Sequence, residues 1–429
     1  NPVILVIREG DKLSLATCER MNYTQEWRHS TGEKLGKVSI LRNVNCTHPH
    51  RGHVDILDSL SSKVCKTFDE LYQHWMEVFS SELLTKKFYN ELSDWYAWAV
   101  QIAKFPNNLA SNEDDDKYNH EACIRLITRL IFVWFLKQKH LIPEEFFDEK
   151  YIRENLIDGF DPHDKQNLYY DAGKSKYYRL VLQNLFFAML NCPIVAEGKT
   201  LPNNRRFRAD TGRNGNDYNM NNLMRYKSEF ADKGAEKFVK LANASVPFLN
   251  GGLFDCLDNK PQNLYYDGFS ERKESLEQLF IPDYLFFGEE VGASIDLSQW
   301  YGDRRKKSVS ARGIVDILKR YSFTIEENTP YDQEVSLDPE LLGKVFENLL
   351  ASYNPETKQS ARKQTGSFYT PREIVQYMVD ESIVAHLMRS CGVEMESQYR
   401  ALLSYASEDP VLTEEQCKAI MHALYDCRV

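Results

Sequence analysis

The stretch from Ala122 to Lys139 constrains the fold more than any other part of the sequence. Its apolar residues, among them Ile127, Leu130 and Trp134, fall around most of the circumference of a helix. A helix of this kind has no wide polar face for water, so it belongs in the centre of a bundle. The sequence therefore predicts a helical domain built around residues 122–139.

Further helices are predicted on both sides of this central one. Apolar residues recur at helical spacing from Phe68 to Phe79 and from Phe88 to Ala99, and again from Tyr177 to Leu190 and from Gly313 to Tyr321. Between them, residues 107–119 are rich in Asn and Asp and predict an exposed loop, and residues 193–222 predict a long irregular surface loop.

The first part of the chain has a different pattern. Pro2 to Arg8 is an apolar run typical of a strand, and a turn at Glu9–Lys12 leads into Leu13–Cys18, which together indicate a hairpin. Lys37 to Val44 alternates well enough to predict a third strand. We interpret residues 1–60 as the C-terminal piece of an α/β or α+β unit that begins upstream.

The composition is that of a folded globular protein, with 42% hydrophobic and 27% charged residues. No apolar run approaches the length of a membrane span and no secretion signal is recognisable, so we expect a cytoplasmic protein without a membrane partner. The nine cysteines are scattered singly, which predicts reduced thiols and no zinc site. His48, His50 and His53 lie in one loop without acidic or cysteine partners, so no metal site is assigned.

The net charge of −10 excludes the overall basic footprint of a simple nucleic-acid-binding domain. Local clusters of cations are the candidates for contacts with DNA phosphates, and the alternative for each is a solvated loop. The candidate DNA-binding residues are Arg205, Arg206, Arg208, Arg304, Arg305, Lys306, Lys307, Arg362 and Lys363.

A helix start is predicted at Thr370. This threonine can cap a helix, Pro371 suits the first helical position, and Glu373 falls where a capping box places its carboxylate. The free backbone amides of such a helix form a seat for an anionic group. The alternative is a well-capped core helix with no ligand.

Residues 337–383, LDPELLGKVFENLLASYNPETKQSARKQTGSFYTPREIVQYMVDESI, resemble the segment before the catalytic core of type IIG-like adenine-specific DNA methyltransferases. In that family a glycine, an aromatic pair and Thr-Pro open a helix beside the S-adenosylmethionine pocket. The resemblance therefore implies that this cofactor contacts Gly366, Phe368, Tyr369, Thr370 and Pro371.

The resemblance extends along most of the chain, through KKFYNELSDWYAWA at 86–99, RLIFVWFLKQKHLIP at 129–143, VPFLNGGLFD at 246–255 and VFENLLASYNPE at 345–356. It implies a mainly α protein, with residues 61–330 as a helical connector domain. The small α/β or α+β N-terminal piece precedes this connector, and residues 331–429 form the helical lead-in to a class I methyltransferase core. Within the VPFLNGGLFD motif, Asn250, Gly251 and Gly252 support either the fold or a DNA-facing loop.

The two motifs that perform the chemistry in this family are absent from the 429 residues. These are the glycine-rich cofactor loop and the Asn-Pro-Pro-aromatic motif that holds the flipped adenine. We expect the catalytic residues downstream of Val429, and a chain that transfers no methyl group by itself.

The resemblance also implies partners. Double-stranded DNA is expected as the substrate, and a nuclease domain or subunit is possible, with Mg²⁺ if that nuclease lies upstream. Glu9, Asp11 and Lys12 lie in a turn and are not assigned to such a nuclease. The alternative function is a noncatalytic DNA-binding or assembly module that positions a partner methyltransferase or nuclease.

Overall fold

The chain forms two compact units, Asn1–Lys363 and Gln364–Val429, and each is described by itself. The structure is a computed structural model. It describes residues 4–22, 33–49, 51–61, 63–79, 81–106, 115–163, 175–191, 224–249, 252–258, 266–271, 273–288, 294–310, 312–324, 332–334, 336–337, 343, 370, 372–403 and 410–427.

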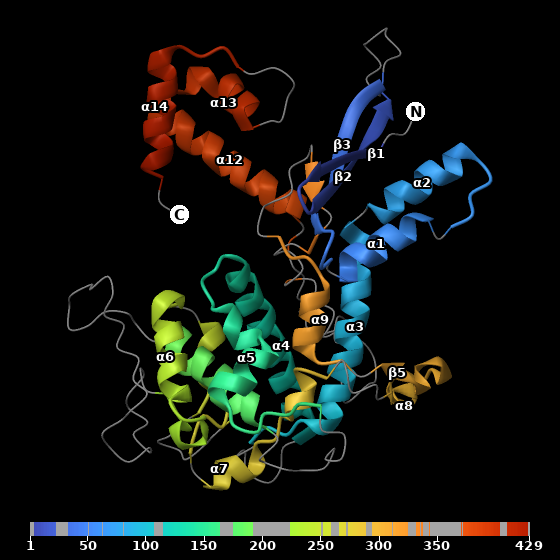
Figure 1. The fold of residues 1–429 in the computed structure, drawn as a ribbon. Helices are drawn as coiled ribbons and strands as arrows, with labels where there is room; N and C mark the ends of the chain where they lie inside the picture. Colours follow the sequence, from blue (N-terminus) through green and yellow to red (C-terminus); the bar gives the residue numbers. More distant parts are fainter. Residues whose placement is uncertain are drawn as a thin grey trace. The chain divides into compact units, whose positions relative to one another are not determined.

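The first unit is mainly helical and carries a small sheet near its start, which confirms the predicted fold class (Figure 1). Helices of the 3-10 or π form are labelled η. The elements of this unit are β1 Ile4–Glu9, β2 Lys12–Asn22, β3 Glu33–Asn45, α1 Arg51–Ser61, α2 Phe68–Val78, α3 Ser81–Ile102, α4 Asp115–Gln138, η1 Glu144–Phe147, α5 Glu149–Tyr151, η2 Ile152–Leu156, η4 Tyr178–Leu190, η5 Lys227–Glu229, α6 Gly234–Ser245, η6 Gly252–Phe254, α7 Lys273–Gln278, η8 Asp283–Leu285, β4 Ser294–Ile295, α8 Ser298–Tyr301, η10 Arg304–Lys307, β5 Val309–Ser310, α9 Ile314–Arg320 and β6 Asp332–Glu334.

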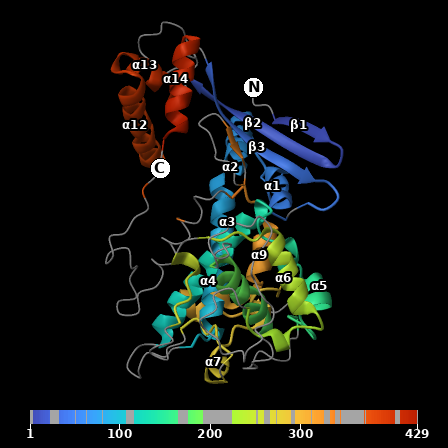
Figure 2. The ribbon, with the colours of Figure 1, turned by 90° about the vertical axis from the view of Figure 1, so that its left-hand side faces the viewer.

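The sheet has the strand order β1-β2-β3-β6. β1 and β2 form the predicted antiparallel hairpin, turning at Gly10, whose φ of +59° suits glycine. β3 is the predicted third strand and pairs antiparallel with β2, so Leu15, Leu41 and Val44 are buried. Ile56 of α1 belongs to the same core, and Figure 2 shows α1 beside the sheet. β6 adds to β3 in parallel, a pairing that no local pattern predicted.

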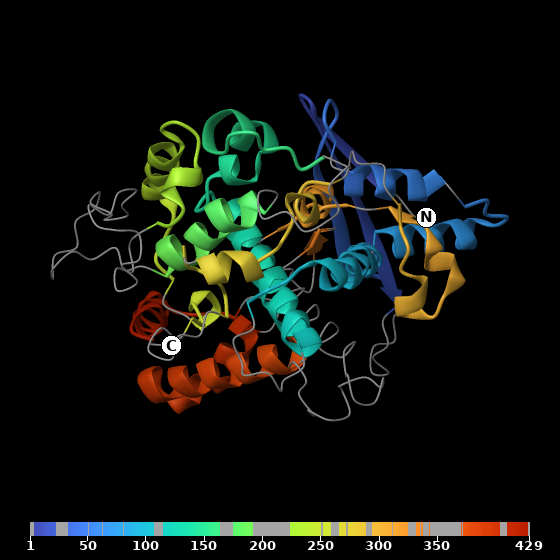
Figure 3. The ribbon, with the colours of Figure 1, turned by 90° about the horizontal axis from the view of Figure 1, so that it is seen from below.

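Helix α4 occupies the centre of the helical part, as predicted. Ile127, Leu130 and Ile131 are fully buried. α4 lies between α3 and η4 (Figure 3). Arg129 of α4 lies over the ring of Phe187 in η4, 4.9 Å from its centroid. The helices predicted at 68–79, 88–99, 177–190 and 313–321 are also present, as α2, α3, η4 and α9.

One loop prediction was wrong in part. Residues 107–119 were expected to form an exposed loop, but α4 begins at Asp115 and Tyr118 is buried. The Tyr118 hydroxyl donates to the backbone oxygen of Tyr266 at 2.6 Å, a hydrogen bond that holds the first turn against a distant segment. Residues 107–114, and the loop predicted at 193–222, lie outside the described residues.

The core of the first unit is continuous. A single cluster of buried side chains runs from Leu15 in β2 to Leu337 near β6. It therefore contains residues on both sides of the segment boundaries that the sequence placed near residues 60 and 330. The division into segments 1–60, 61–330 and 331–429 stays a prediction.

The second unit has a small core of its own. Val384, Leu387, Tyr399, Ile420 and Ala423 form it. Its elements are α12 Arg372–Cys391, η11 Val393–Met395, α13 Glu396–Leu403 and α14 Glu414–Tyr425. The helices predicted after Pro371 and at 414–425 are confirmed by α12 and α14. Among the described helices of both units, none is long and apolar enough to cross a membrane.

Candidate nucleic-acid interface

A small hairpin carries the basic cluster Arg304–Lys307. β4 and β5 pair antiparallel through Ser294–Ser310 and Ile295–Val309, and α8 and η10 lie between them. The backbone N–H of Leu297 donates to the oxygen of Lys306 at 2.9 Å, which closes the loop between the two strands. Figure 1 shows α8 and β5 at the periphery of the first unit. We call residues 294–310 the basic hairpin.

Lys306 fastens the basic hairpin to the helical core. Its Nζ lies 2.7 Å from both carboxylate oxygens of Asp94 in α3, and 5.0 Å from the centroid of the Tyr301 ring. Both partners of the ion pair are partly buried. Lys306 was predicted to bind DNA, but this cation already neutralises a carboxylate of the protein.

The other three cations of the cluster are exposed. Arg304 and Lys307 face solvent, and the side chain of Arg305 is 90% exposed. Arg305 pairs with Asp303 at 2.9 Å, and hydrogen bonds from Arg305 lower the pKa of the Asp303 carboxyl. An exposed pair of this kind contributes little free energy, so Arg305 can exchange its carboxylate for a phosphate.

The basic hairpin also carries two partly exposed aromatic side chains. Trp300 and Tyr301 of α8 are 36% and 38% exposed. Trp300 stacks on His120 with ring centroids 5.5 Å apart, and His120 shares a 2.8 Å hydrogen bond with the Tyr96 hydroxyl. Exposed cations next to half-exposed rings are the combination with which proteins hold nucleic-acid backbones and bases.

The remaining predicted site residues are placed only in part. Thr370 is described and exposed. The residues of the cofactor and DNA predictions that lie outside the described residues are Arg205, Arg206, Arg208, Arg362, Lys363, Gly366, Phe368, Tyr369 and Pro371. Those assignments, and the capping box at Thr370, stay predictions.

The start of α12 presents an apolar surface. Its first half exposes large side chains to between 44% and 65%, although the second half supplies the core of the unit. The exposed residues are Ile374, Val375, Tyr377, Met378 and Val379. Neighbouring exposed apolar side chains of this kind are typical of surfaces that bind another group.

A buried polar network fixes the VPFLNGGLFD motif. Arg129 of α4 donates to the backbone oxygens of Leu253 at 2.8 Å and Asp255 at 3.0 Å, and pairs with Asp267 at 3.2 Å. These hydrogen bonds hold Leu253 and Asp255 at the end of the motif. Asn250 and Gly251 lie outside the described residues, so the two uses given for Asn250, Gly251 and Gly252 stay predictions. Arg129 was not singled out from the sequence, although an arginine inside an apolar helix is a signal that its charge has a buried partner.

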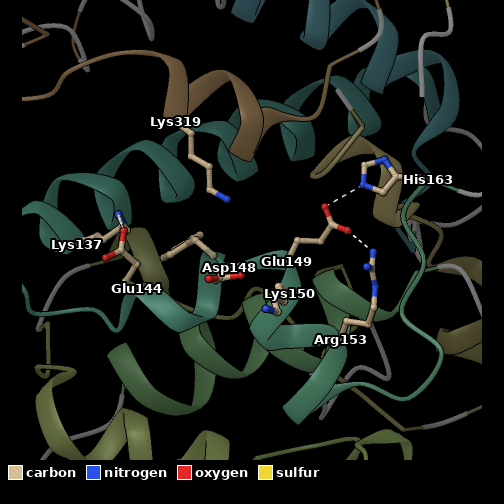
Figure 4. A pocket seen from close by; sticks show the side chains of 9 residues that line it. Lys137, Glu144, Asp148, Glu149, Lys150, Arg153, His163 and Lys319 are labelled. Atoms are coloured by element: carbon tan, nitrogen blue, oxygen red, sulfur yellow. Dashed lines mark hydrogen bonds and ion pairs between the residues drawn. The ribbon is translucent and has the colours of Figure 1, made fainter. Parts of the chain in front are cut away.

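A polar cavity on the first unit was not predicted from the sequence either (Figure 4). It has a volume of about 440 Å³. Eight of its nine lining residues fall within residues 137–163, and Lys319 of α9 joins them from a distant part of the sequence. The residues that line it are Lys137, Glu144, Phe147, Asp148, Glu149, Lys150, Arg153, His163 and Lys319.

The comparison with curated proteins gives a distant relative. Over 307 residues the chain is 23% identical to a protein of Methanocaldococcus jannaschii named "putative type II restriction enzyme and methyltransferase". The aligned region covers 71% of this chain and 18% of the relative, so the chain spans less than a fifth of that protein. No protein-family profile matches the chain, and no solved structure matches it. The chain is thus a distant homologue of a protein with this name.

Proposed function

We propose that this chain is the DNA-contacting and cofactor-side part of a bacterial type IIG-like restriction-modification enzyme. The whole enzyme transfers the methyl group of S-adenosylmethionine to the exocyclic amine of adenine in double-stranded DNA. The similarity over 71% of the chain to the archaeal relative carries this proposal. The adenine specificity rests on the resemblance of residues 337–383 to that family.

The basic hairpin supports the DNA-contacting role. Arg304, Arg305 and Lys307 are exposed on the same hairpin as Trp300 and Tyr301, and Lys306 anchors this segment to α3. In this role the three exposed cations neutralise backbone phosphates and fix the position of the duplex. Such phosphate contacts do not distinguish one DNA sequence from another. Base recognition and extrusion belong to other parts of the enzyme.

The start of α12 supports the cofactor-side role. When bound, S-adenosylmethionine supplies an electrophilic methyl group and presents a carboxylate. The residues that would hold it are Gly366, Phe368, Tyr369, Thr370 and Pro371. The free amides at the start of a helix of 20 residues suit this carboxylate, and the apolar side chains beyond them suit packing against a methyltransferase core.

The test is a methylation assay with two proteins. The full-length enzyme, incubated with labelled S-adenosylmethionine and unmethylated mixed-sequence DNA, should yield N6-methyladenine. The 429-residue chain should yield none, because it lacks the glycine-rich loop and the Asn-Pro-Pro-aromatic motif. Methylcytosine from the full-length enzyme would overturn the adenine assignment, and methylation by the 429-residue chain would reveal an active site that we have missed.

The second candidate is a noncatalytic DNA-binding or assembly module, and the absence of both catalytic motifs from this sequence favours it for the chain by itself. Both candidates are compatible with a partner nuclease domain or subunit that uses Mg²⁺. The methylation assay distinguishes the two candidates. The module is the correct one if the full-length protein binds DNA and stimulates a separate methyltransferase but transfers no methyl group itself.

A further inference from the structure

We infer that the polar cavity of the first unit binds a phosphate group. The cavity lies at the ends of α4 and α9, next to η1, α5 and η2, and at about 440 Å³ it has the size of a small-ligand site. Figure 4 shows charged side chains reaching it from opposite walls, with Lys319 pointing in from α9. This inference does not depend on whether the enzyme transfers methyl groups. Both nucleotides and nucleic acids carry the phosphate that the cavity would bind.

Cations outnumber carboxylates in the lining. Three of the four cations fall within residues 137–153, and the fold brings the fourth to them from α9. The four cations are Lys137, Lys150, Arg153 and Lys319. The three carboxylates are Glu144, Asp148 and Glu149, and His163 adds a further positive charge when it is protonated. A net positive lining on a chain of net charge −10 favours an anionic ligand.

The carboxylates are already engaged. Glu144 accepts from Lys137 at 2.8 Å, and that hydrogen bond lowers the pKa of the Glu144 carboxyl. Glu149 faces two donors, Arg153 and His163, the latter at 2.9 Å. Asp148 caps α5, accepting from the backbone N–H of Tyr151 at 3.1 Å. Each of the three carboxylates therefore already accepts a hydrogen bond from a donor of the protein. These carboxylates are poorly suited to bind a metal cation.

Lys150 and Lys319 add two ammonium groups to this lining. Both side chains are exposed at the rim of the cavity, on α5 and α9. Lys319 lies 5.7 Å from the centroid of the Phe287 ring, which supports its aliphatic stem. A phosphate bound in this cavity would accept charge-assisted hydrogen bonds from these ammonium groups, while His163 stays paired with Glu149.

Calorimetric titration of the 429-residue chain at low salt tests the inference, with inorganic phosphate, ATP and a mixed-sequence DNA duplex as probes. Phosphate or ATP should bind, and Lys319→Gln and Lys150→Gln should each weaken binding by about tenfold. Lys319→Arg should retain most of the affinity. The matched control is Lys240→Gln, which removes one exposed charge from α6 of the same unit and should change nothing. Thermal unfolding of each variant verifies its fold.

The probes distinguish the source of the phosphate. If ATP displaces the duplex and the cavity variants weaken both, the cavity binds the DNA backbone, whereas ATP binding without competition assigns a nucleotide. The inference is overturned if neither phosphate nor ATP binds, or if Lys240→Gln weakens binding as much as the cavity variants do. Variants of the basic hairpin separate this outcome from the proposed function, because they should reduce duplex binding and leave phosphate binding unchanged.

Discussion

Lys306 in η10 and Asp94 in α3 form an ion pair across 212 residues of the chain, with both carboxylate oxygens 2.7 Å from the ammonium nitrogen. The two residues therefore attach the basic hairpin to a helix of the core. This relationship divides the basic cluster into a structural cation and three cations that remain exposed, Arg304, Arg305 and Lys307.

The structural role of Lys306 predicts that Lys306→Gln lowers the free energy of unfolding by about 1 kcal/mol, because a partly buried pair is removed and Asp94 keeps its charge. Urea unfolding measures this. Asp94→Asn should cost a similar amount, and it should raise DNA affinity because it releases a cation and removes an anion. A Lys306→Gln variant of unchanged stability would show that the pair does not hold the hairpin.

The exposed cations predict weak, strongly salt-dependent DNA binding. Replacing Arg304, Arg305 and Lys307 together by Gln should reduce the slope of log affinity against log salt by about 0.9 for each phosphate that the variant no longer neutralises. The stability should change little, since these side chains are exposed. Fluorescence anisotropy between low and moderate salt measures the slope. Equal slopes for this variant and the wild type would show that these three cations do not contact DNA and are only solvated.

The clusters at Arg205, Arg206 and Arg208 and at Arg362 and Lys363 are tested in the same way. Their charge-removal variants should lower the slope further if they share the DNA surface. If affinity is unchanged after charge removal at all three clusters, DNA binding does not depend on any of these residues.

Thr370 carries the prediction for the cofactor side of the full-length enzyme. Thr370→Ala should lower local stability by about 1 kcal/mol because the cap is removed, and should weaken S-adenosylmethionine binding. Thr370→Ser should preserve both, because the hydroxyl remains. Calorimetric titration with the cofactor and thermal unfolding are the measurements. Reduced stability with intact cofactor affinity would make the segment from Phe368 to Glu373 a structural helix start.

Buried Asp283 predicts a pH dependence of stability. Burial raises the pKa of its carboxyl to about 8 from 3.8, although it accepts a 2.8 Å hydrogen bond from the backbone N–H of Tyr177. The folded state therefore binds this proton more tightly than the unfolded state. The associated stability is fully present below about pH 4 and is lost as the pH rises toward and through 8.

Asp283→Asn tests this directly, since an amide oxygen can still accept from Tyr177 but does not titrate. The loss of unfolding free energy between pH 4 and pH 8 should be smaller in the variant than in the wild type. Denaturant unfolding at several pH values measures it. Identical pH profiles would mean that Asp283 titrates alike in the folded and unfolded chain.

The sequence by itself determined the local elements, because their causes lie within a few residues. Apolar side chains around most of the circumference placed α4 at the centre, and Gly10 marked the turn of the first hairpin. The start of α14 follows from Thr413, whose hydroxyl and Gln416 form a capping box with both hydrogen bonds present. The start of α4 was misplaced because polar residues typical of a loop also favour the first turn of a helix.

Only the tertiary structure decided which distant residues meet. The pairing of β6 with β3, the hydrogen bonds of Arg129 to Leu253 and Asp255, and the approach of Lys319 to the cavity lined by residues 137–163 all join segments that no local pattern connects. A charge on the sequence can be solvated, paired or poised for a ligand, and the difference depends on what the fold places within a few ångströms of it. Lys306 and Arg304 lie two residues apart in the same basic run, yet of these two it is Lys306 that meets Asp94, because the hairpin turns that side chain toward α3.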